Sequence, residues 1–169
     1  MRGGTTRGSV VVMALAILLP AVASCGAAAG GPPEIVVDRT ACSHCGMLIS
    51  EPLYAAAYQA AGSEGRTFDD IGCLLAALAT ESATALRHEL QQPRVPPSGG
   101  RVWFHDVASG EWIDGRAASF VRSSTIRTPM GGGIIAFRDP AVAARAADVQ
   151  RGVLVTSIAA LIGHQGDGQ

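Results

Sequence analysis

The densest group of chemically reactive side chains in this sequence lies between positions 42 and 47. The segment reads Cys-Ser-His-Cys-Gly-Met and holds two thiols, an imidazole and a thioether. Each of these groups can bind a soft metal ion, and the combination favours Cu(I) over hard ions. A thioether is a poor zinc ligand, so the presence of Met47 favours a copper site over a zinc site. Gly46 allows a backbone turn that other residues resist, and such a turn could aim Cys45 and Met47 at one point.

Three other interpretations of Cys42 and Cys45 stay open. The pair could form a disulfide, as exported cysteines often do. It could be a redox pair in which a thiolate of low pKa attacks a partner disulfide. Such a pair normally begins a helix after a buried strand, but Pro52 interrupts any helix here. It could also be half of a zinc site, although the sequence offers no second Cys-x-x-Cys or His-x-His pair to complete one.

The first 24 residues are typical of a bacterial lipoprotein signal peptide. Two arginines precede an apolar run from Val10 to Ala23, which is shorter than the ~20 apolar residues that span a bilayer. Small residues before Cys25 resemble the lipobox at which the thiol is lipidated and the chain is cut. We therefore expect a lipid anchor on Cys25, a flexible linker over 25–34, and an extracytoplasmic protein tethered to a bacterial membrane. An ordinary secretory signal with a chance cysteine is the alternative.

Composition narrows the function further. The net charge is −1, and the thirteen basic residues are all arginines scattered along the chain, so nucleic-acid binding has no support. No Ser/His/Asp arrangement, phosphate-binding loop or paired carboxylates stand out, so we expect a protein that is not an enzyme. With Cys25 lipidated, three cysteines remain, and an odd number outside the cytoplasm leaves a free thiol or places thiols on a metal.

A second sulfur feature is the segment Thr128-Pro-Met-Gly-Gly-Gly133. Met13 leaves with the signal peptide, so the mature chain keeps only Met47 and Met130, each beside glycine. A methionine in such a loop is less suited to filling a core than one at helical spacing. The two methionines together suggest one site shared between two parts of the chain.

The remaining single residues have less specific interpretations. Cys73 lies one residue outside the apolar face of a predicted helix, and we expect a buried, inert thiol there. We expect the isolated histidines to be surface or internally satisfied residues, namely His88, His105 and His164.

The elements that carry these residues form two similar halves. In the first, strands at 54–60 and 66–68 precede a helix whose apolar positions share one face, and a strand at 101–106 follows. Those helix positions are Ile71, Leu74, Leu75 and Leu78. Asp69 or Asp70 can cap this helix.

The second half repeats that order. Strands are predicted at 118–122 and 134–137, then a helix capped by Asp139 with Pro140 at its first position, then a strand at 153–157. Its predicted buried face holds Val142, Ala146 and Val149. Phe68-Asp69-Asp70 and Phe137-Arg138-Asp139 occupy equivalent places at the strand-to-helix junctions. The sequence therefore predicts an α+β fold of two ββαβ modules, at 35–107 and 108–169, behind a signal peptide (1–24) and a linker (25–34).

Three segments in this order resemble the NosL family, over roughly residues 35 to 161. They are Cys42-x-x-Cys-Gly-Met47, Phe68-Asp-Asp-Ile-Gly-Cys73 and Thr128-Pro-Met-Gly-Gly-Gly-x-x-Ala-Phe137. The resemblance implies a lipoprotein that acts as a copper chaperone in the maturation of nitrous oxide reductase. It also implies a fold of two ββαβ modules, which agrees with the repeat inferred from the strand and helix patterns.

The resemblance also implies a ligand set for Cu(I). Cys45 and Met47 match the Cys-x-Met copper motif of the family, and Met130 matches the methionine of the second module. Cys42 is absent from some members, so it could be a further ligand, a redox partner or incidental, and His44 is an additional donor.

The expected partners are the client enzyme and its membrane assembly complex. Two alternatives remain at this point: an extracytoplasmic thiol–disulfide oxidoreductase that uses Cys42 and Cys45, and a structural lipoprotein with a disulfide staple.

Overall fold

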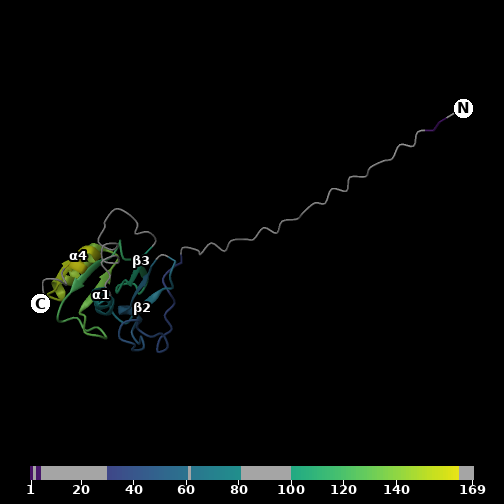
Figure 1. Ribbon diagram of the computed structural model, residues 1–169. Helices are drawn as coiled ribbons and strands as arrows, with labels where there is room; N and C mark the ends of the chain where they lie inside the picture. The colour runs from purple at the N-terminus through teal and green to yellow at the C-terminus, as the bar shows by residue number, and fades with distance from the viewer. Residues whose placement is uncertain (2, 5–29, 61, 81–99, 164–169) are drawn as a thin grey trace.

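A computed structural model describes residues 1, 3–4, 30–60, 62–80 and 100–163 of the chain. The predicted signal peptide, apart from residues 1, 3 and 4, lies outside these residues. So do Cys25, the linker up to position 29, His88, His164 and the proline-rich loop up to position 99. Within the described residues, no helix is both long enough and apolar enough to cross a membrane. The described residues form two antiparallel sheets with helices packed against them (Figure 1).

The first sheet is built from a strand–strand–helix–strand unit. Its elements are β1 (Ala56–Gln59), β2 (Arg66–Phe68), helix α1 (Ile71–Thr80) and β3 (Arg101–His105). Strand β1 is central and pairs antiparallel with both β2 and β3. A short 3₁₀ helix, η1 (Pro52–Tyr54), precedes β1, and a fourth strand, β4 (Trp112–Asp114), pairs with β3 at the sheet edge.

The second sheet repeats this unit. Its elements are β5 (Ser119–Arg122), β6 (Ile134–Phe137), helix α3 (Pro140–Val149) and β7 (Val153–Val155), followed by helix α4 (Ile158–Gly163). Strand β5 is central, and the order β6-β5-β7 reproduces the order β2-β1-β3. The predicted α+β fold with a ββαβ unit used twice is therefore confirmed.

The two helices of the repeat begin in the same way. Phe68 ends β2 and Phe137 ends β6. Two residues after each phenylalanine, an aspartate accepts a hydrogen bond from the first turn of the helix. Asp70 Oδ1 accepts from Cys73 N at 2.8 Å, and Asp139 Oδ1 accepts from Ala141 N at 2.7 Å. These bonds satisfy backbone N–H groups that the helix itself cannot pair.

Helix α1 lies between the two sheets, whereas α3 packs mainly on the strands of the second. Helix α1 contacts β1 and β2 of the first sheet and β6 of the second, and Figure 1 shows it between their strands. This position explains why α1 is apolar on most of its surface, with Ile71, Leu74, Leu75 and Leu78 all buried as predicted. Leu74 and Leu75 belong to one core cluster with residues of both modules.

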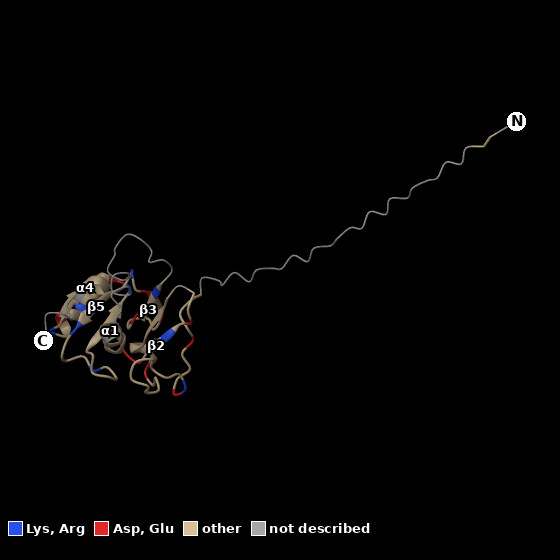
Figure 2. Cartoon of the chain, viewed as in Figure 1, with Lys and Arg blue, Asp and Glu red and all other residues tan. Residues whose placement is uncertain are grey.

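The sheets also meet directly. Asp106, just after β3, forms a parallel bridge with Ala136 of β6. In the core, the rings of Phe104 and Phe120 meet edge to face with centroids 5.0 Å apart, a favourable aromatic geometry. The modules therefore share one hydrophobic core. Figure 2 shows acidic and basic residues interspersed over the described elements of both modules.

Three features differ from the sequence prediction. Ala143 and Ala147 are buried on α3, the predicted Val142 and Ala146 are partly buried against the same cluster, and the predicted Val149 is 79% exposed. The prediction was therefore wrong for Val149 and missed the smaller Ala143 and Ala147 on the helix that contacts β5. Strand β4 and helix α4 were not predicted. β4 follows a tight turn that Gly110 makes with a φ of 77°, and α4 is a short helix whose Ile158, Leu161 and Ile162 complete the core.

Candidate metal centre

The segment from Ala41 to Leu48 forms a closed loop that presents the first two cysteines. Cys42 N donates to Met47 O at 2.8 Å, and Gly46 N donates to Cys42 O at 2.9 Å. Gly46 takes the left-handed conformation that the sequence predicts, with a φ of 77°. Ser43 N donates to Thr67 O of β2 at 2.8 Å. This bond places the loop beside the strand that leads into α1.

Three thiols meet where this loop faces the start of α1. The sulfur atoms of Cys42, Cys45 and Cys73 lie within 4.8 Å of one another. Cys42 and Cys73 are buried, whereas Cys45 is exposed. All three are free thiols. The cluster therefore has two donors inside the protein and one at its surface, a geometry suited to a soft metal ion.

Cys73 is the member of this cluster that sequence reasoning missed. The prediction that it is buried is confirmed, but an inert packing role does not describe a thiol that lies beside two others. The sequence indicated its position only indirectly. Cys73 lies three residues after the capping Asp70, in helix α1, which follows β2 directly. The pairing of the cysteine loop with β2 and the packing of Cys42 and Cys73 in one core bring the two segments together.

The three thiols have different acidities. Burial would raise the pKa of Cys42, but backbone N–H groups of Cys45, Asp69 and His44 donate to its sulfur and lower the pKa below 9.0. Burial raises the pKa of Cys45, and the neighbouring Cys42 adds to this. Burial also raises the pKa of Cys73, with further contributions from Cys42, Cys45 and Asp70. Cys42 is therefore the thiol most ready to ionise, and a bound cation would favour ionisation of the others.

Asp69 and Asp70 lie beside the cluster and differ in their hydrogen bonding. Burial raises the pKa of Asp69, and the negative charges of Asp70 and Glu51 raise it further. One oxygen of Asp69 is buried without a hydrogen-bond partner. Asp70 is completely buried but well bonded, and it is the aspartate that caps α1.

Asp70 also binds the methionine loop of the second module. Its Oδ2 accepts hydrogen bonds from the Thr128 hydroxyl at 2.7 Å, from Met130 N at 3.3 Å and from Gly132 N at 3.2 Å. The loop that carries Met130 is therefore fixed against the first turn of α1, which carries Cys73. This contact brings the sulfur-bearing segments of the two modules to one region of the molecule.

The other predicted ligands lie at the surface of this region. Met47 is 56% exposed and Met130 is 41% exposed, although methionine is an apolar residue. Both lie in loops. His44 is also exposed. The prediction that His105 is a surface or satisfied residue is wrong, because its Nδ1 is buried without a hydrogen-bond partner among the described residues and its ring packs on Trp112 with centroids 3.7 Å apart.

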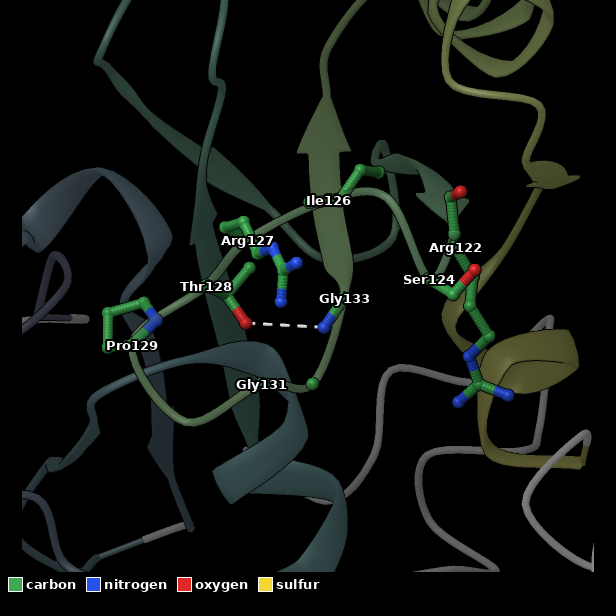
Figure 3. A pocket seen from close by; sticks show the side chains of 10 residues that line it. Arg122, Ser124, Ile126, Arg127, Thr128, Pro129, Gly131 and Gly133 are labelled. Atoms are coloured by element: carbon green, nitrogen blue, oxygen red, sulfur yellow. Dashed lines mark hydrogen bonds between the residues drawn. The ribbon is translucent and has the colours of Figure 1, made fainter.

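A cavity of about 380 Å³ lies against the loop that carries Met130. Residues between β5 and β6 line it, and Figure 3 shows Arg127, Thr128 and Gly133 within that loop. The Thr128 hydroxyl accepts a hydrogen bond from Gly133 N at 3.2 Å. The loop is thus braced internally by Thr128 as well as externally by Asp70.

The fold and the cluster together define a class: an α+β protein of two ββαβ units with a partly exposed three-thiol site. The model of the NosL family matches residues 33–159, and the chain therefore belongs to the NosL family. No curated protein matches the chain.

A solved structure supports the same fold. The crystal structure of the copper chaperone NosL from Shewanella denitrificans is similar to this chain with a TM-score of 0.54 and 22% sequence identity. The similarity covers 74% of this chain and 92% of that one.

Proposed function

We propose that this protein is a Cu(I)-binding chaperone that is tethered outside the cytoplasm and passes its ion to a copper enzyme. The observation that carries the proposal is the meeting of three thiol sulfurs within 4.8 Å, with one of them exposed. Membership of the NosL family and the likeness to a solved structure described as a copper chaperone support it. The protein would bind and transfer an ion without catalytic turnover.

The donor set favours Cu(I) among metal ions. Thiolates and thioethers are soft ligands, and Cu(I) is the soft ion that commonly uses both. Cys45 is the central ligand in this proposal, with Met47 and Met130 as neutral donors. Cys42 and Cys73 are buried beside Cys45 and can supply further thiolates, and His44 is an additional donor.

The exposure of the donors suggests how the ion leaves. Cys45, Met47 and Met130 are all accessible to solvent, while the buried thiols lie behind Cys45. A client that presents thiolate or imidazole groups can approach the exposed donors and replace them one at a time. Such stepwise exchange transfers the ion without releasing it to water.

The lipid tether and the client complete the proposal. Small residues before Cys25 support lipidation of this cysteine, which would hold the protein near a membrane assembly complex and raise its local concentration there. Nitrous oxide reductase is the proposed client, because the sequence motifs resemble those of the family that serves this enzyme.

A thiol–disulfide oxidoreductase fits the cluster less well. An attacking thiol in such enzymes is accessible and has a lowered pKa. Here the thiol with the lowered pKa, Cys42, is 2% exposed, and the pKa of the exposed Cys45 is raised, first by burial and then by Cys42. Accessibility and acidity are therefore divided between two residues.

Competition with a Cu(I) chelator tests the proposal. The reduced full-length protein should bind Cu(I) tightly, Cys45→Ser should weaken binding most, and Met47→Leu and Met130→Leu should each weaken it by about tenfold, or about 1.4 kcal/mol. Leu53→Met is a matched control that adds a partly exposed thioether outside the cluster and should leave affinity unchanged. An affinity that neither methionine variant changes from that of the unaltered protein would overturn a site shared between the modules. A disulfide-reductase activity that is lost in Cys45→Ser and unaffected by the methionine changes would favour the oxidoreductase.

A further inference from the structure

Asp70 connects the two modules at the thiol cluster through a carboxylate that is wholly buried. Within the described residues no arginine pairs with it, since the ion pairs there join Arg101 to Asp114 and Arg138 to Glu111. A buried carboxylate without a cation is unfavourable unless hydrogen bonds replace its lost hydration. The four donors around Asp70 supply that replacement.

The two oxygens of this carboxylate serve different elements. Oδ1 accepts from Cys73 N, 2.8 Å away, in the first turn of α1. Among the residues that the structure describes, the donors to Oδ2 all come from the second module: Thr128 Oγ1, Met130 N and Gly132 N. The backbone N–H groups of Cys73 and Met130 thus share one carboxylate, although Cys73 lies in helix α1 of the first module and Met130 in a loop of the second.

We propose that Asp70 is a positioning residue, which holds the Met130 loop against Cys73 so that the thioether of the second module is available to an ion on the thiols of the first. The inference rests on the proposed Cu(I) function and adds a residue that does not itself touch the ion. Capping α1 requires only one acceptor oxygen, and the equivalent Asp139 caps α3 with its Oδ1. The second oxygen of Asp70 is therefore committed to the methionine loop.

Because the two oxygens of Asp70 bind different elements, the structure predicts which replacements of Asp70 lose the bonds to the Met130 loop. Serine can accept a bond from the helix N–H group and is a good cap, but its single short hydroxyl cannot also reach the loop. Asparagine keeps the shape of aspartate but offers one acceptor oxygen, so it cannot serve the helix and the loop together. Thr128→Val leaves the cap intact and removes one donor to Oδ2, together with the acceptor of the internal bond from Gly133 N.

The matched control is in the second module. Asp139→Ser changes the same type of cap on α3, and Asp139 makes no bond to the Met130 loop. It therefore measures the effect of altering a helix cap alone. Thr128→Val keeps the test informative if Asp70→Ser does not fold.

The experiment combines two measurements on the full-length reduced protein. The first is amide hydrogen exchange of the metal-free protein at Met130 and Gly132. Asp70→Ser and Thr128→Val should each speed this exchange by about tenfold or more, since bonds to a charged acceptor are the stronger ones, and Asp139→Ser should not. Unchanged exchange in both variants overturns the inference.

The second measurement is Cu(I) affinity in a double-mutant cycle. Asp70→Ser should weaken binding by the same factor as Met130→Leu, and the double variant should bind no more weakly than Asp70→Ser alone. The inference is overturned if the loss of affinity in the double variant equals the product of the two single losses. It is also overturned if Asp70→Ser leaves the affinity unchanged while Met130→Leu lowers it. If the unaltered protein binds no Cu(I), the proposed function fails instead, and the exchange data still decide whether Asp70 holds the loop.

Discussion

Gly72 and Gly132 touch backbone to backbone where the two modules meet. A Cβ atom placed on Gly72 would lie 3.0 Å from the Cα of Gly132, and one placed on Gly132 would lie 3.0 Å from the Cα of Gly72. Both positions also face the carboxylate of Asp70 at 3.1 Å. Gly72 belongs to α1 and Gly132 to the methionine loop, so the absence of both side chains allows the loop to approach the thiol cluster.

Gly72→Ala should destabilise the protein, although glycine-to-alanine changes in helices usually stabilise by up to about 1 kcal/mol. The added methyl group must push the loop from α1, a strain of about 1–3 kcal/mol. Chemical denaturation of the two proteins measures the difference, and Cu(I) affinity should fall as the methionine loop moves away. A stabilised variant with unchanged affinity would show that the close approach does not matter.

Cys73→Ser should weaken Cu(I) binding by about tenfold or more, since a soft thiolate is replaced by a hydroxyl. The chelator competition described above measures this affinity, and a thermal unfolding curve checks that the variant is folded. Cys73→Ala should bind as weakly as the serine variant. If both retain full affinity, Cys73 is the buried packing residue that its sequence context first indicated.

The affinity for Cu(I) should rise with pH. Burial raises the pKa of Cys45 and of Cys73 above the ordinary 9.0, so both carry a proton at neutral pH. Each thiol that becomes a ligand must release this proton, and the affinity should increase by about tenfold per pH unit for each one released. Competition titrations between pH 6 and 8, with the chelator's own protonation corrected, measure the slope. A flat profile would mean that neither thiol is a ligand.

Asp69→Asn should stabilise the protein at neutral pH. Burial, then the charges of Asp70 and Glu51, raise the pKa of Asp69 above 3.8 in the folded state. The unfolded chain therefore releases the proton of Asp69 first, and stability is lost as pH rises from 3.8 through the folded pKa. The asparagine stays neutral, so its advantage should be absent near pH 3 and present at pH 7. Denaturant titrations at both pH values test this, and equal stabilities at pH 7 would contradict it.

Much of the fold follows from local patterns in the sequence. The spacing of Leu74, Leu75 and Leu78 identifies α1, and the pair Asp139-Pro140 marks the start of α3. The junctions at Phe68 and Phe137 reveal the repeat. The face of α3 followed only in part: Val142 and Ala146 are partly buried, but Ala143 and Ala147, which a preference for large apolar residues overlooks, are its fully buried residues.

The candidate site was only partly predictable. Cys42, Cys45 and Met47 stand within one loop, so the sequence favours a soft-metal site there, although it leaves a disulfide, a redox pair or half of a zinc site open. Cys73 joins them because the cysteine loop pairs with Thr67 of β2 and Cys42 packs in the same core as Cys73, contacts between segments distant in sequence. The role of Asp70 was hidden for the same reason, since its capping bond is local while its bonds to the Met130 loop span about sixty positions of sequence.

X-ray absorption at the copper edge tests the central claim most directly. Reduced full-length protein loaded with one equivalent of Cu(I) should show a copper shell dominated by sulfur. Met47→Leu and Met130→Leu should each remove one sulfur neighbour, and Cys45→Ser should remove the thiolate that anchors the ion. A shell of oxygen or nitrogen atoms, or a sulfur count that both methionine changes leave unaltered, would contradict a Cu(I) site assembled from the two modules.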